Sequence, residues 1–585
     1  MDIGYWACAR RVHPSRAHPT ALGLQSFGQA QDRSPISNIQ YPISNPHSPI
    51  SILLILAGIA LAVAPLSLAA AGVAGIAFVI ALLLRPEIGL WALPFAVPFG
   101  LIRGLPLAGF GVGATEYLVG LTLAAWLGHG IAHRRLRIQS PPLLLPLLLL
   151  LGAMLLSATG MYAVPPTAKE LVKWGEILVV YVLTFNMVQN GRTGVILTAA
   201  LLLAGSLSAL QGVAGSLLHI GPPQFAILGG RLYRASGTFA QPNPFGGYMN
   251  HSLPIAVSLL VASVIATGME ARGKWGLDIG YWILDIGYWI LERGRGNVSG
   301  HGKPSNPPPA LRAGLQSPIP NPQSPIPTIA LAGVCGVLVA GLALSWSRGA
   351  WLGAMAGLIA VGVAWAVAIL TDVASGPGAR ALRRRVFTLL WLVSALAVVF
   401  VLLGGFNVLP ASIEGRIGSA VATFTTLDAR GANITDANFA TLERVAHWQA
   451  AWDMWRDHFW TGIGIGNYEA AYADYRLPKW PTALGHAHNI YFNMAAEIGF
   501  IGLLAYLAFV VSAVGHTWQV ARRAPAPAVR GLAIGVLGVL IALVVHNFFD
   551  NMYVHGMGVH LALARGLVSA LGREGISSPS KKLNR

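Results

Sequence analysis

Long apolar runs, separated by short polar segments, dominate the chain. Most of these runs approach the length that a helix needs to cross the roughly 30 Å hydrocarbon core of a membrane. Because backbone polar groups must be satisfied internally within lipid, each run is predicted to be a helix. We therefore expect an all-α, polytopic transmembrane bundle of about 14 spans, at 51–65, 67–84, 87–102, 114–131, 143–160, 172–189, 193–215, 246–267, 328–345, 349–370, 386–404, 488–514, 530–549 and 551–571.

One large polar segment, 405–487, interrupts the apolar runs. Within it, residues 441–460 are predicted to form a helix, because apolar and aromatic residues recur at three- and four-residue steps. Thr441 is a candidate N-cap for this helix. The helix could lie on the membrane surface or cover the bundle, and a lid over a lipid-linked substrate is compatible with either. Its expected apolar face consists of Leu442, Val445, Trp448, Trp452, Trp455 and Phe459.

Charge supports the membrane class and predicts an orientation. The chain is 55% hydrophobic and only 10% charged, with a mean hydropathy of +0.61, which excludes an ordinary soluble protein of 585 residues. The net charge of +17 reflects loop arginines rather than a nucleic-acid site. Arginines gather at 134–137, 380–385 and 522–530, which share one side of a fourteen-span topology with both termini. The positive-inside bias makes that side cytoplasmic and 405–487 external to the cytoplasmic membrane.

A repeated cassette occurs in two polar segments. Asp-Ile-Gly-Tyr-Trp stands at 2–6, 278–282 and 285–289, and Ser-Pro-Ile motifs follow in both segments. One interpretation is a translated repetitive element that loops tolerate; the other is an aromatic motif for the membrane interface. Neither contributes to the functional argument.

The resulting organisation has seven parts, taken in chain order. They are a disordered cytoplasmic N-terminal repeat segment (1–50), N-terminal transmembrane helices (51–272), a cytoplasmic low-complexity insert (273–327), further transmembrane helices (328–404), the external loop (405–487), C-terminal transmembrane helices (488–572) and a cytoplasmic tail (573–585).

Candidate chemistry lies in three polar clusters on the predicted external side. Arg348 begins the tenth span, His486 and His488 begin the twelfth, and Arg231 and Arg234 lie in the loop before the eighth. Arginine binds phosphate oxygens in pairs, and histidine can act as a base near neutral pH. Together they suit a diphosphate leaving group and an attacking hydroxyl. Alone, each arginine could simply reach lipid headgroups, and each histidine could make only a polar contact.

A glycine-rich stretch, Thr-Gly-Ile-Gly-Ile-Gly-Asn at 461–467, only superficially resembles a nucleotide-binding loop. No strand is predicted before it, and no Lys-Ser/Thr follows on a helix. A sharp turn after the preceding helix is the better interpretation. The two cysteines, Cys8 and Cys335, are far apart, so no disulfide framework or metal site can be read.

The order of these motifs resembles the O-antigen ligase/polymerase family of integral-membrane glycosyltransferases. The resemblance covers roughly 225–265 and 328–515. It rests on Arg-Ala-Ser-Gly-Thr-Phe-Ala-Gln-Pro-Asn at 234–243, Ser-Trp-Ser-Arg-Gly-Ala-Trp at 345–351, Glu-Arg at 443–444 with Trp448, Gly-Ile-Gly-Ile-Gly-Asn-Tyr at 462–468, His-Ala-His-Asn-Ile-Tyr at 486–491 and Glu-Ile-Gly at 497–499. The repeat cassettes and two extra spans depart from the family pattern.

The resemblance implies a fold of the C-type glycosyltransferase kind and transfer of a glycan from a polyprenyl-diphosphate carrier, without metal, nucleotide or other cofactor. It implies that Arg348 and Arg234 hold the diphosphate and that His488 activates the acceptor hydroxyl. Arg444 and Arg231 are further candidates for the diphosphate. Secondary candidates are His486, Asn489, Asn243 and Trp351.

Several functions remain open from the sequence. The acceptor could be a lipid, another glycan unit or a protein, so ligase, polymerase and protein O-oligosaccharyltransferase share these motifs. A transporter or flippase of lipid-linked sugars is an alternative of another class, although two similar halves with charges at the membrane midplane are not evident. A non-catalytic envelope scaffold is a third. The expected partners are the lipid-linked donor, the acceptor and membrane lipids, with no nucleic acid.

Overall fold

The computed structural model describes residues 66–100, 105–107, 110–134, 136–270, 326–372, 428–435 and 438–576. Several predictions lie outside these residues. They concern the N-terminal segment 1–50, the spans 51–65 and 386–404, nearly all of the insert 273–327, the start of the external loop and most of the C-terminal tail.

Every predicted span within the described residues coincides with a helix, so the all-α class is confirmed there. Six of these helices are long and apolar enough to cross a membrane, namely α7 (Gly191–Leu217), α8 (Pro242–Glu270), α11 (Ile326–Ser345), α12 (Arg348–Asp372), α17 (Ile490–Arg523) and α18 (Pro527–His546). The others are α2 (Leu66–Leu84), α3 (Glu87–Phe99), α4 (Ala114–Ala132), α5 (Leu144–Ser157), α6 (Val164–Met187) and α19 (Met557–Ile576). Since several of these are short or carry charges, the number of about 14 spans stays a prediction.

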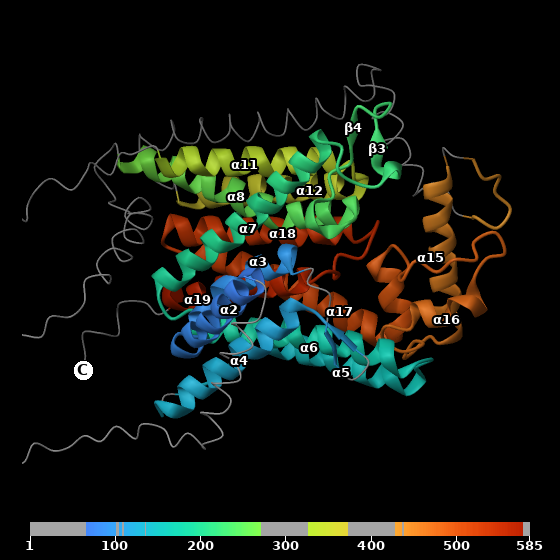
Figure 1. Ribbon diagram of the computed structural model, residues 1–585, viewed down its shortest axis with the longest axis horizontal. Helices are drawn as coiled ribbons and strands as arrows, with labels where there is room; N and C mark the ends of the chain where they lie inside the picture. The colour runs from blue at the N-terminus through green and yellow to red at the C-terminus, as the bar shows by residue number, and fades with distance from the viewer. Residues whose placement is uncertain are drawn as a thin grey trace, which may run out of the picture. The chain divides into compact units, whose positions relative to one another are not determined.

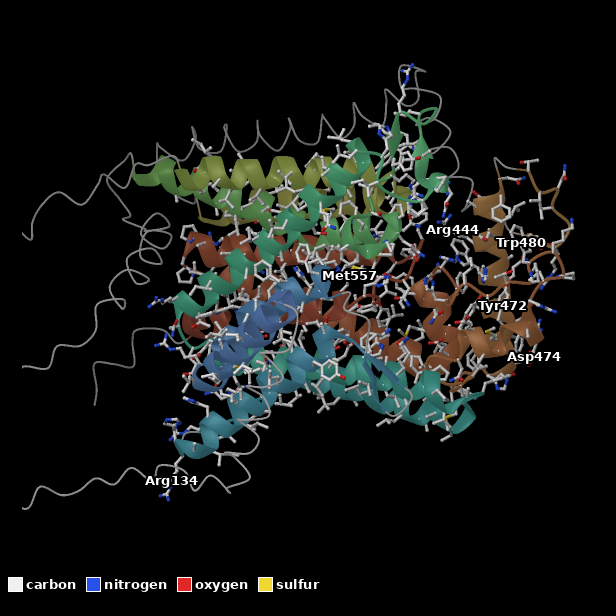
Figure 2. The ribbon with its side chains drawn as sticks, in the orientation of Figure 1. Arg134, Arg444, Tyr472, Asp474, Trp480 and Met557 are labelled. Carbon is white, nitrogen blue, oxygen red and sulfur yellow. The ribbon has the colours of Figure 1, made fainter. Side chains whose placement is uncertain are left out.

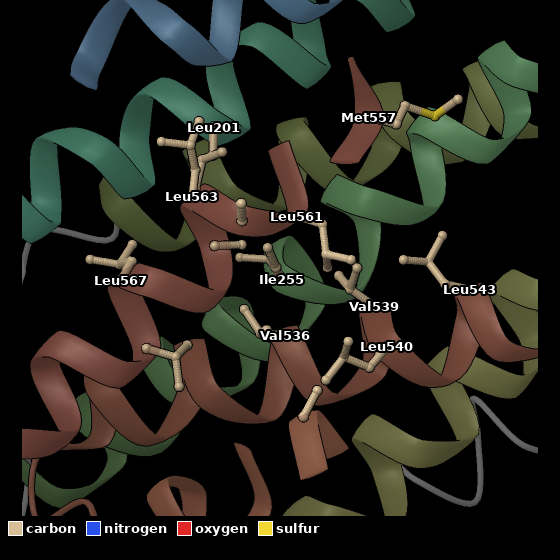
Figure 3. Close-up of a cluster of buried hydrophobic side chains, with 14 of the residues drawn as sticks. Leu201, Ile255, Val536, Val539, Leu540, Leu543, Met557, Leu561, Leu563 and Leu567 are labelled. Carbon is tan, nitrogen blue, oxygen red and sulfur yellow. The ribbon is translucent and has the colours of Figure 1, made fainter. Parts of the chain in front are cut away.

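The centre of the bundle is formed by α18, which packs on α8, α12 and α17. Residues 77–585 cluster as one unit, within which these contacts lie. Figure 1 shows the long helices side by side, with α18 beneath α8 and α12 and above α17. Their leucine, isoleucine and valine side chains fill the interior, including Ile255, Val536 and Leu563 (Figure 3).

Small residues permit a close contact between α12 and α18. A Cβ on Gly357 of α12 would lie 2.6 Å from the backbone oxygen of Gly538 on α18. Glycine at this crossing therefore lets the two backbones approach, as is common between membrane helices.

The predicted external helix exists as α15 (Phe439–Asp457) and is followed by the short helix α16 (Tyr468–Tyr475). Both lie at one end of the bundle (Figure 1). The predicted N-cap was wrong: Thr441 is buried inside α15, and Asn438 precedes its first residue.

The predicted aromatic face of α15 is only partly its buried face. Leu442 and Val445 are buried, but Trp452 is 50% exposed, and the interior side is completed by small residues such as Ala446 and Ala450. Alanines allow α15 to approach its neighbours closely, whereas the aromatic rings beyond Trp452 stack on one another.

The glycine-rich segment 462–466 forms a turn that docks into a break in α17. Gly499 has a φ of 65°, which interrupts the helix. The break leaves backbone carbonyl groups of α17 without helical partners, and the turn donates hydrogen bonds to them. The Ile463 N–H donates to Ala496 O at 2.9 Å, and the Gly464 N–H donates to Glu497 O at 3.0 Å. The Glu497 carboxylate in turn accepts a hydrogen bond from the Tyr468 N–H at the start of α16. The turn is therefore a structural clasp between α15, α16 and α17.

Short hairpins are the only β-structure among the described residues. β1 (Leu105–Leu107) pairs antiparallel with β2 (Phe110–Val112), and β3 (Ala226–Ile227) pairs with β4 (Leu232–Tyr233), with Ile227 opposite Leu232. Single 3₁₀ turns occur at η1 (Ala158–Gly160), η2 (Pro223–Phe225) and η3 (Gly237–Phe239). Arg234, which directly follows β4, lines the cavity described below.

Candidate functional site

A polar cavity of about 180 Å³ lies where the hairpin, the α11–α12 turn, α15 and the loop after α18 meet. It gathers three of the four arginines proposed from the sequence. Its lining consists of Arg234, Asn243, Trp346, Ser347, Arg348, Gly349, Ala440, Arg444, His546, Phe549 and Asp550.

Arg234 is held by the ends of two helices. Its Nε donates to Ser345 O at 3.1 Å, and Nη2 donates to the side-chain oxygen of Asn243 at 3.1 Å. The neighbouring backbone is tied down as well, because the Ala235 N–H donates to Leu344 O at 2.7 Å. These contacts place a planar guanidinium at the cavity wall with its orientation set by α8 and α11.

Arg348 enters the cavity through a tight break between α11 and α12. Trp346 adopts a left-handed φ of 54°, and the Ser345 hydroxyl oxygen accepts a hydrogen bond from the Ser347 N–H. Trp351 supports this turn, since its Nε1 donates to Leu342 O at 3.0 Å. As the first residue of α12, Arg348 lines the cavity from the helix N-terminus, where the helix dipole also favours an anion.

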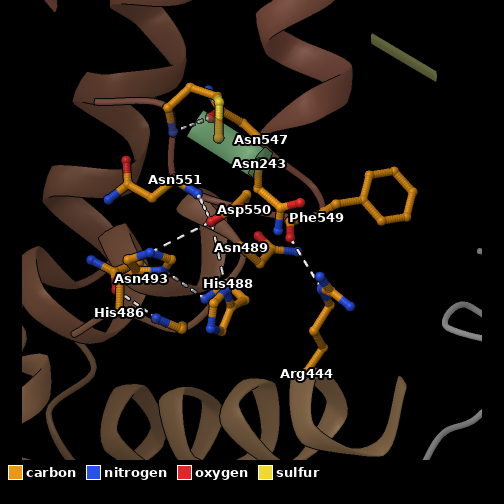
Figure 4. Close-up of polar contacts among 12 residues, drawn as sticks. Asn243, Arg444, His486, His488, Asn489, Asn493, Asn547, Phe549, Asp550 and Asn551 are labelled. Atoms are coloured by element: carbon orange, nitrogen blue, oxygen red, sulfur yellow. Dashed lines mark hydrogen bonds and ion pairs between the residues drawn. The ribbon is translucent and has the colours of Figure 1, made fainter. Parts of the chain in front are cut away.

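Arg444 reaches the cavity from α15 on the opposite wall. Its Nε donates to Phe549 O at 3.3 Å, and Nη1 donates to Ala440 O at 2.9 Å. The first contact links α15 to the loop after α18 (Figure 4). Figure 2 shows that Arg444 lies at the opposite end of the bundle from Arg134. Because carbonyl oxygens carry no full negative charge, these contacts do not neutralise the Arg444 guanidinium, which keeps its positive charge at the cavity wall.

His486 and His488 converge on one carboxylate, that of Asp550 (Figure 4). His486 Nε2 and His488 Nδ1 each lie 3.5 Å from Asp550 Oδ1. On a regular helix, side chains two residues apart would not face each other. His488 has a left-handed φ of 51°, so the turn swings both rings to the same side, with centroids 4.5 Å apart.

The hydrogen bonds specify a tautomer for His486. Its Nδ1 accepts from the His488 backbone N–H at 3.1 Å, so that nitrogen carries a lone pair. The proton of the neutral ring must then lie on Nε2, facing Asp550. In His488, Nδ1 lies 3.5 Å from the carboxylate, and both ring nitrogens are buried without a close hydrogen-bond partner. A proton on Nδ1 is favoured because it faces the anion, which leaves the lone pair on Nε2. That nitrogen is the one available to accept a proton.

Burial and charge act together on these groups. Burial alone would raise the pKa of Asp550, but the hydrogen bond and charge of His488, together with His486 and His546, hold it below its usual range. Burial lowers the pKa of His486 to about 4, and the Asp550 charge only partly offsets this. Asp550 is therefore an anion and His486 a neutral donor at neutral pH.

The same three side chains form the one group of potential metal ligands found in the described part of the chain, with ligand atoms within 4.8 Å of one another. The His486 tautomer opposes this use. A metal would need the lone pair of Nε2, whereas the backbone hydrogen bond at Nδ1 places the proton there. The arrangement fits a hydrogen-bonded acid–histidine cluster better than a metal centre.

The remaining sequence candidates have different positions. Asn489 is the N-cap of α17, where its Oδ1 accepts from the Tyr491 and Phe492 N–H groups. Asn243 lines the cavity, whereas Trp351 braces the turn before α12. Arg231 is exposed on the β3–β4 turn and is not among the cavity residues.

Two cavity residues, Asp550 and His546, were missed by the sequence interpretation. Asp550 stands between two predicted spans and is the single acidic residue between Glu497 and Glu574, a signal that could have identified it. His546 ends α18 and lies against Gly349, where an added Cβ would be 2.7 Å from the imidazole Cδ2. The glycine after Arg348 therefore makes room for this ring.

Comparison with known proteins gives one family match. Residues 333–507 match the family model described as O-antigen ligase. No curated protein matches the chain. The matched segment contains Arg348, Arg444, His486 and His488, while Arg234 and Asp550 join the site from outside it. Residues 333–507 are therefore similar to the O-antigen ligase family.

Proposed function

We propose that the protein is a membrane glycosyltransferase that moves a glycan from a polyprenyl-diphosphate carrier to an acceptor hydroxyl. The family supports an enzyme of O-antigen ligase or polymerase type. The observation that carries the finer proposal is the cavity in which Arg234, Arg348 and Arg444 meet beside the Asp550–histidine cluster.

The arginines would hold the carrier diphosphate. Guanidinium groups form paired hydrogen bonds with phosphate oxygens, and three of them approach the cavity from different elements. Their charges would stabilise the diphosphate as negative charge develops on the leaving oxygen. Asp550 on the same lining would repel the diphosphate, so we expect the carrier to bind on the arginine side of the cavity.

His488 would act as the general base. In the transfer, the acceptor O–H bond breaks and its proton moves to Nε2, while the acceptor oxygen bonds to the anomeric carbon. The bond from that carbon to the phosphate oxygen breaks, and its electron pair leaves with the diphosphate. Inversion at the anomeric carbon is expected from the family resemblance.

Asp550 would orient the base and stabilise its charged form. A carboxylate at Nδ1 keeps Nε2 as the acceptor and favours the imidazolium that forms. His486 donates to the same carboxylate oxygen from the other side, so it positions Asp550 rather than reacting itself.

The orientation in the membrane is part of the proposal. We propose that the site faces the external side of the cytoplasmic membrane and that both termini are cytoplasmic, as the arginine-rich loops predict. Single cysteines placed at Thr435 and Arg134 in a cysteine-free background test this. An impermeant reagent should label position 435 in intact cells, and labelling of position 134 instead would reverse the topology.

The deciding experiment is a transfer assay with purified protein and a polyprenyl-diphosphate glycan, with and without ATP. Lipid, glycan and peptide acceptors in separate reactions would separate ligase, polymerase and protein-glycosylating activities. Transfer without nucleotide is expected. Movement of the lipid-linked glycan across vesicles without bond cleavage would instead support the flippase alternative.

A further inference from the structure

A second charged site lies inside the bundle, away from the carrier cavity. Arg565 is on α19 and is only 4% exposed. It is eight residues after the first residue of α19, about 12 Å along the helix at 1.5 Å per residue. None of the residues lining the carrier cavity is among its hydrogen-bond partners.

Arg565 has no acidic counterpart among the described residues. Its Nη1 donates to the Thr517 hydroxyl, and Nη2 lies 3.2 Å from His516 Nδ1. No described carboxylate lies within ion-pair distance of it. Its Nε is buried without any partner. A buried charge is rarely left in this state, because an unpaired ion in a low-dielectric interior is strongly destabilising.

A cavity of about 40 Å³ adjoins this guanidinium. Besides Arg565, its wall includes Trp174, whose buried indole Nε1 also has no partner. Most of the remaining wall is apolar, including Leu147 of α5 and Phe509 of α17. Two of the lining residues therefore each carry a buried N–H donor without a partner, and one of the two is charged.

We infer that this cavity binds an oxyanion of the phosphate class through Arg565 and Trp174. An acceptor with negative charge would satisfy both donors and neutralise the arginine. The volume accommodates about three water-sized groups, which is enough for the two free oxygens of a lipid phosphodiester or for most of an inorganic phosphate. The phosphate could belong to an anionic membrane lipid or be free in solution.

The surrounding charges favour entry of the phosphate from the arginine-rich end of the bundle. Thr517 and His516 lie shortly before Arg522 and Arg523, the last residues of α17, and Arg573 follows on α19. These three arginines raise the local concentration of anionic lipid phosphate. A bound phosphate would join α6, α17 and α19, whose contact otherwise leaves donors unsatisfied.

Thermal unfolding of the purified full-length protein in neutral detergent tests the inference. Phosphatidylglycerol, phosphatidylcholine and inorganic phosphate would be titrated separately, and the dissociation constant would be taken from the shift in Tm. We expect phosphatidylglycerol or inorganic phosphate to raise the Tm and phosphatidylcholine to have no such effect. The comparison between the first two identifies the source of the phosphate.

Arg565→Gln should weaken binding by at least tenfold, and Trp174→Phe, which keeps the ring but removes the donor, should weaken it several-fold. Arg231→Gln is the matched control, because that arginine is exposed on the β3–β4 turn, away from α17 and α19. Trp174→Phe also keeps the test decisive if Arg565→Gln does not fold. Equal shifts in the wild type and Trp174→Phe, a loss in Arg231→Gln equal to that in Arg565→Gln, or no shift with either anion would overturn the inference.

Discussion

His488 and Asp550 come from the residues before α17 and after α18, yet Nδ1 of the histidine lies 3.5 Å from Oδ1 of the acid. Two further hydrogen bonds hold the segments that carry this pair together. The Asn489 side chain donates to Phe548 O at 3.2 Å, and the Ile490 N–H donates to Asn547 O at 2.9 Å. The start of one helix is therefore bound directly to the end of another, which positions a base against its carboxylate.

Asp550→Asn should lower the transfer rate by roughly 10²–10⁴-fold, because the amide removes the charge that stabilises the protonated base. Carrier affinity should not fall, since the arginines remain and a negative charge on the cavity lining is removed. The comparison of kcat and KM for the carrier checks this. Asp453→Asn, which alters an acid paired with Arg430 on the outer side of α15, is the control and should stay near wild type. An Asp550→Asn variant with normal kcat would exclude the orienting role.

Arg348→Lys should raise the carrier KM by about tenfold or more while the protein remains folded. Lysine keeps the charge but cannot form the paired hydrogen bonds of the guanidinium. Arg231→Lys is the matched control, because Arg231 is exposed and does not line the cavity. If both substitutions have the same small effect, the contribution of Arg348 is general electrostatic attraction rather than diphosphate binding.

Gly464→Ala should destabilise the clasp between α15, α16 and α17. The backbone at Gly464 has a φ of 96°, and a Cβ there would lie 2.6 Å from Met161 Cα. A left-handed alanine alone costs about 1–2 kcal/mol. A Tm several degrees below that of the wild type is expected, with Gly431→Ala, where nothing lies within 4 Å of an added Cβ, unchanged. Similar Tm values for the two variants would show that the turn containing Gly464 does not stabilise the fold.

Acid should weaken the packing around α15 and the start of α17 before it protonates Asp550. Burial, followed by the charges of His488 and His486, lowers the pKa of His447 to about 3, and burial lowers that of His486 to about 4. An unfolded histidine titrates near 6.5. Below that pH the unfolded chain binds protons that the folded chain does not, so stability falls between about pH 6.5 and 4.

The measurement is the Tm of the purified protein between pH 7.5 and 4.5. His447→Gln should flatten the profile, because it removes one of the groups that bind protons only on unfolding. A Tm that is constant over this range in the wild type would show that neither histidine keeps its pKa depressed.

The sequence anticipated the helices better than their contacts. Apolar runs identify helices such as α12 and α18 because membrane burial imposes length and composition directly. The buried side of α15 was predicted only in part, since periodicity locates an apolar face but does not reveal that alanines, rather than Trp452, meet the neighbouring helix. The docking of Gly464 onto Glu497 is a contact between distant segments, which no local pattern encodes.

For the candidate site, too, individual residues were predicted better than the contacts between distant segments. Arg234 and Arg348 were predicted because charges next to apolar helices are unusual, and they do line one cavity. Asp550 was missed because it stands between two predicted spans with no motif around it. The orientation of His486 could not be predicted because it depends on the left-handed backbone of His488, which is disfavoured for a residue with a Cβ.

The last prediction separates the two histidines. His488→Ala should reduce transfer by roughly 10²–10⁴-fold with little change in carrier binding, as expected for loss of a positioned base. His486→Ala should have a smaller effect, because it removes one donor to Asp550 and leaves the base in place. His486→Asn, which restores a donor, should recover part of that loss, whereas His488→Asn should not recover. The measurements are single-turnover rates and Tm for all four variants. A normal rate for His488→Ala, or a larger loss for His486→Ala at unchanged Tm, would assign the base to the other histidine.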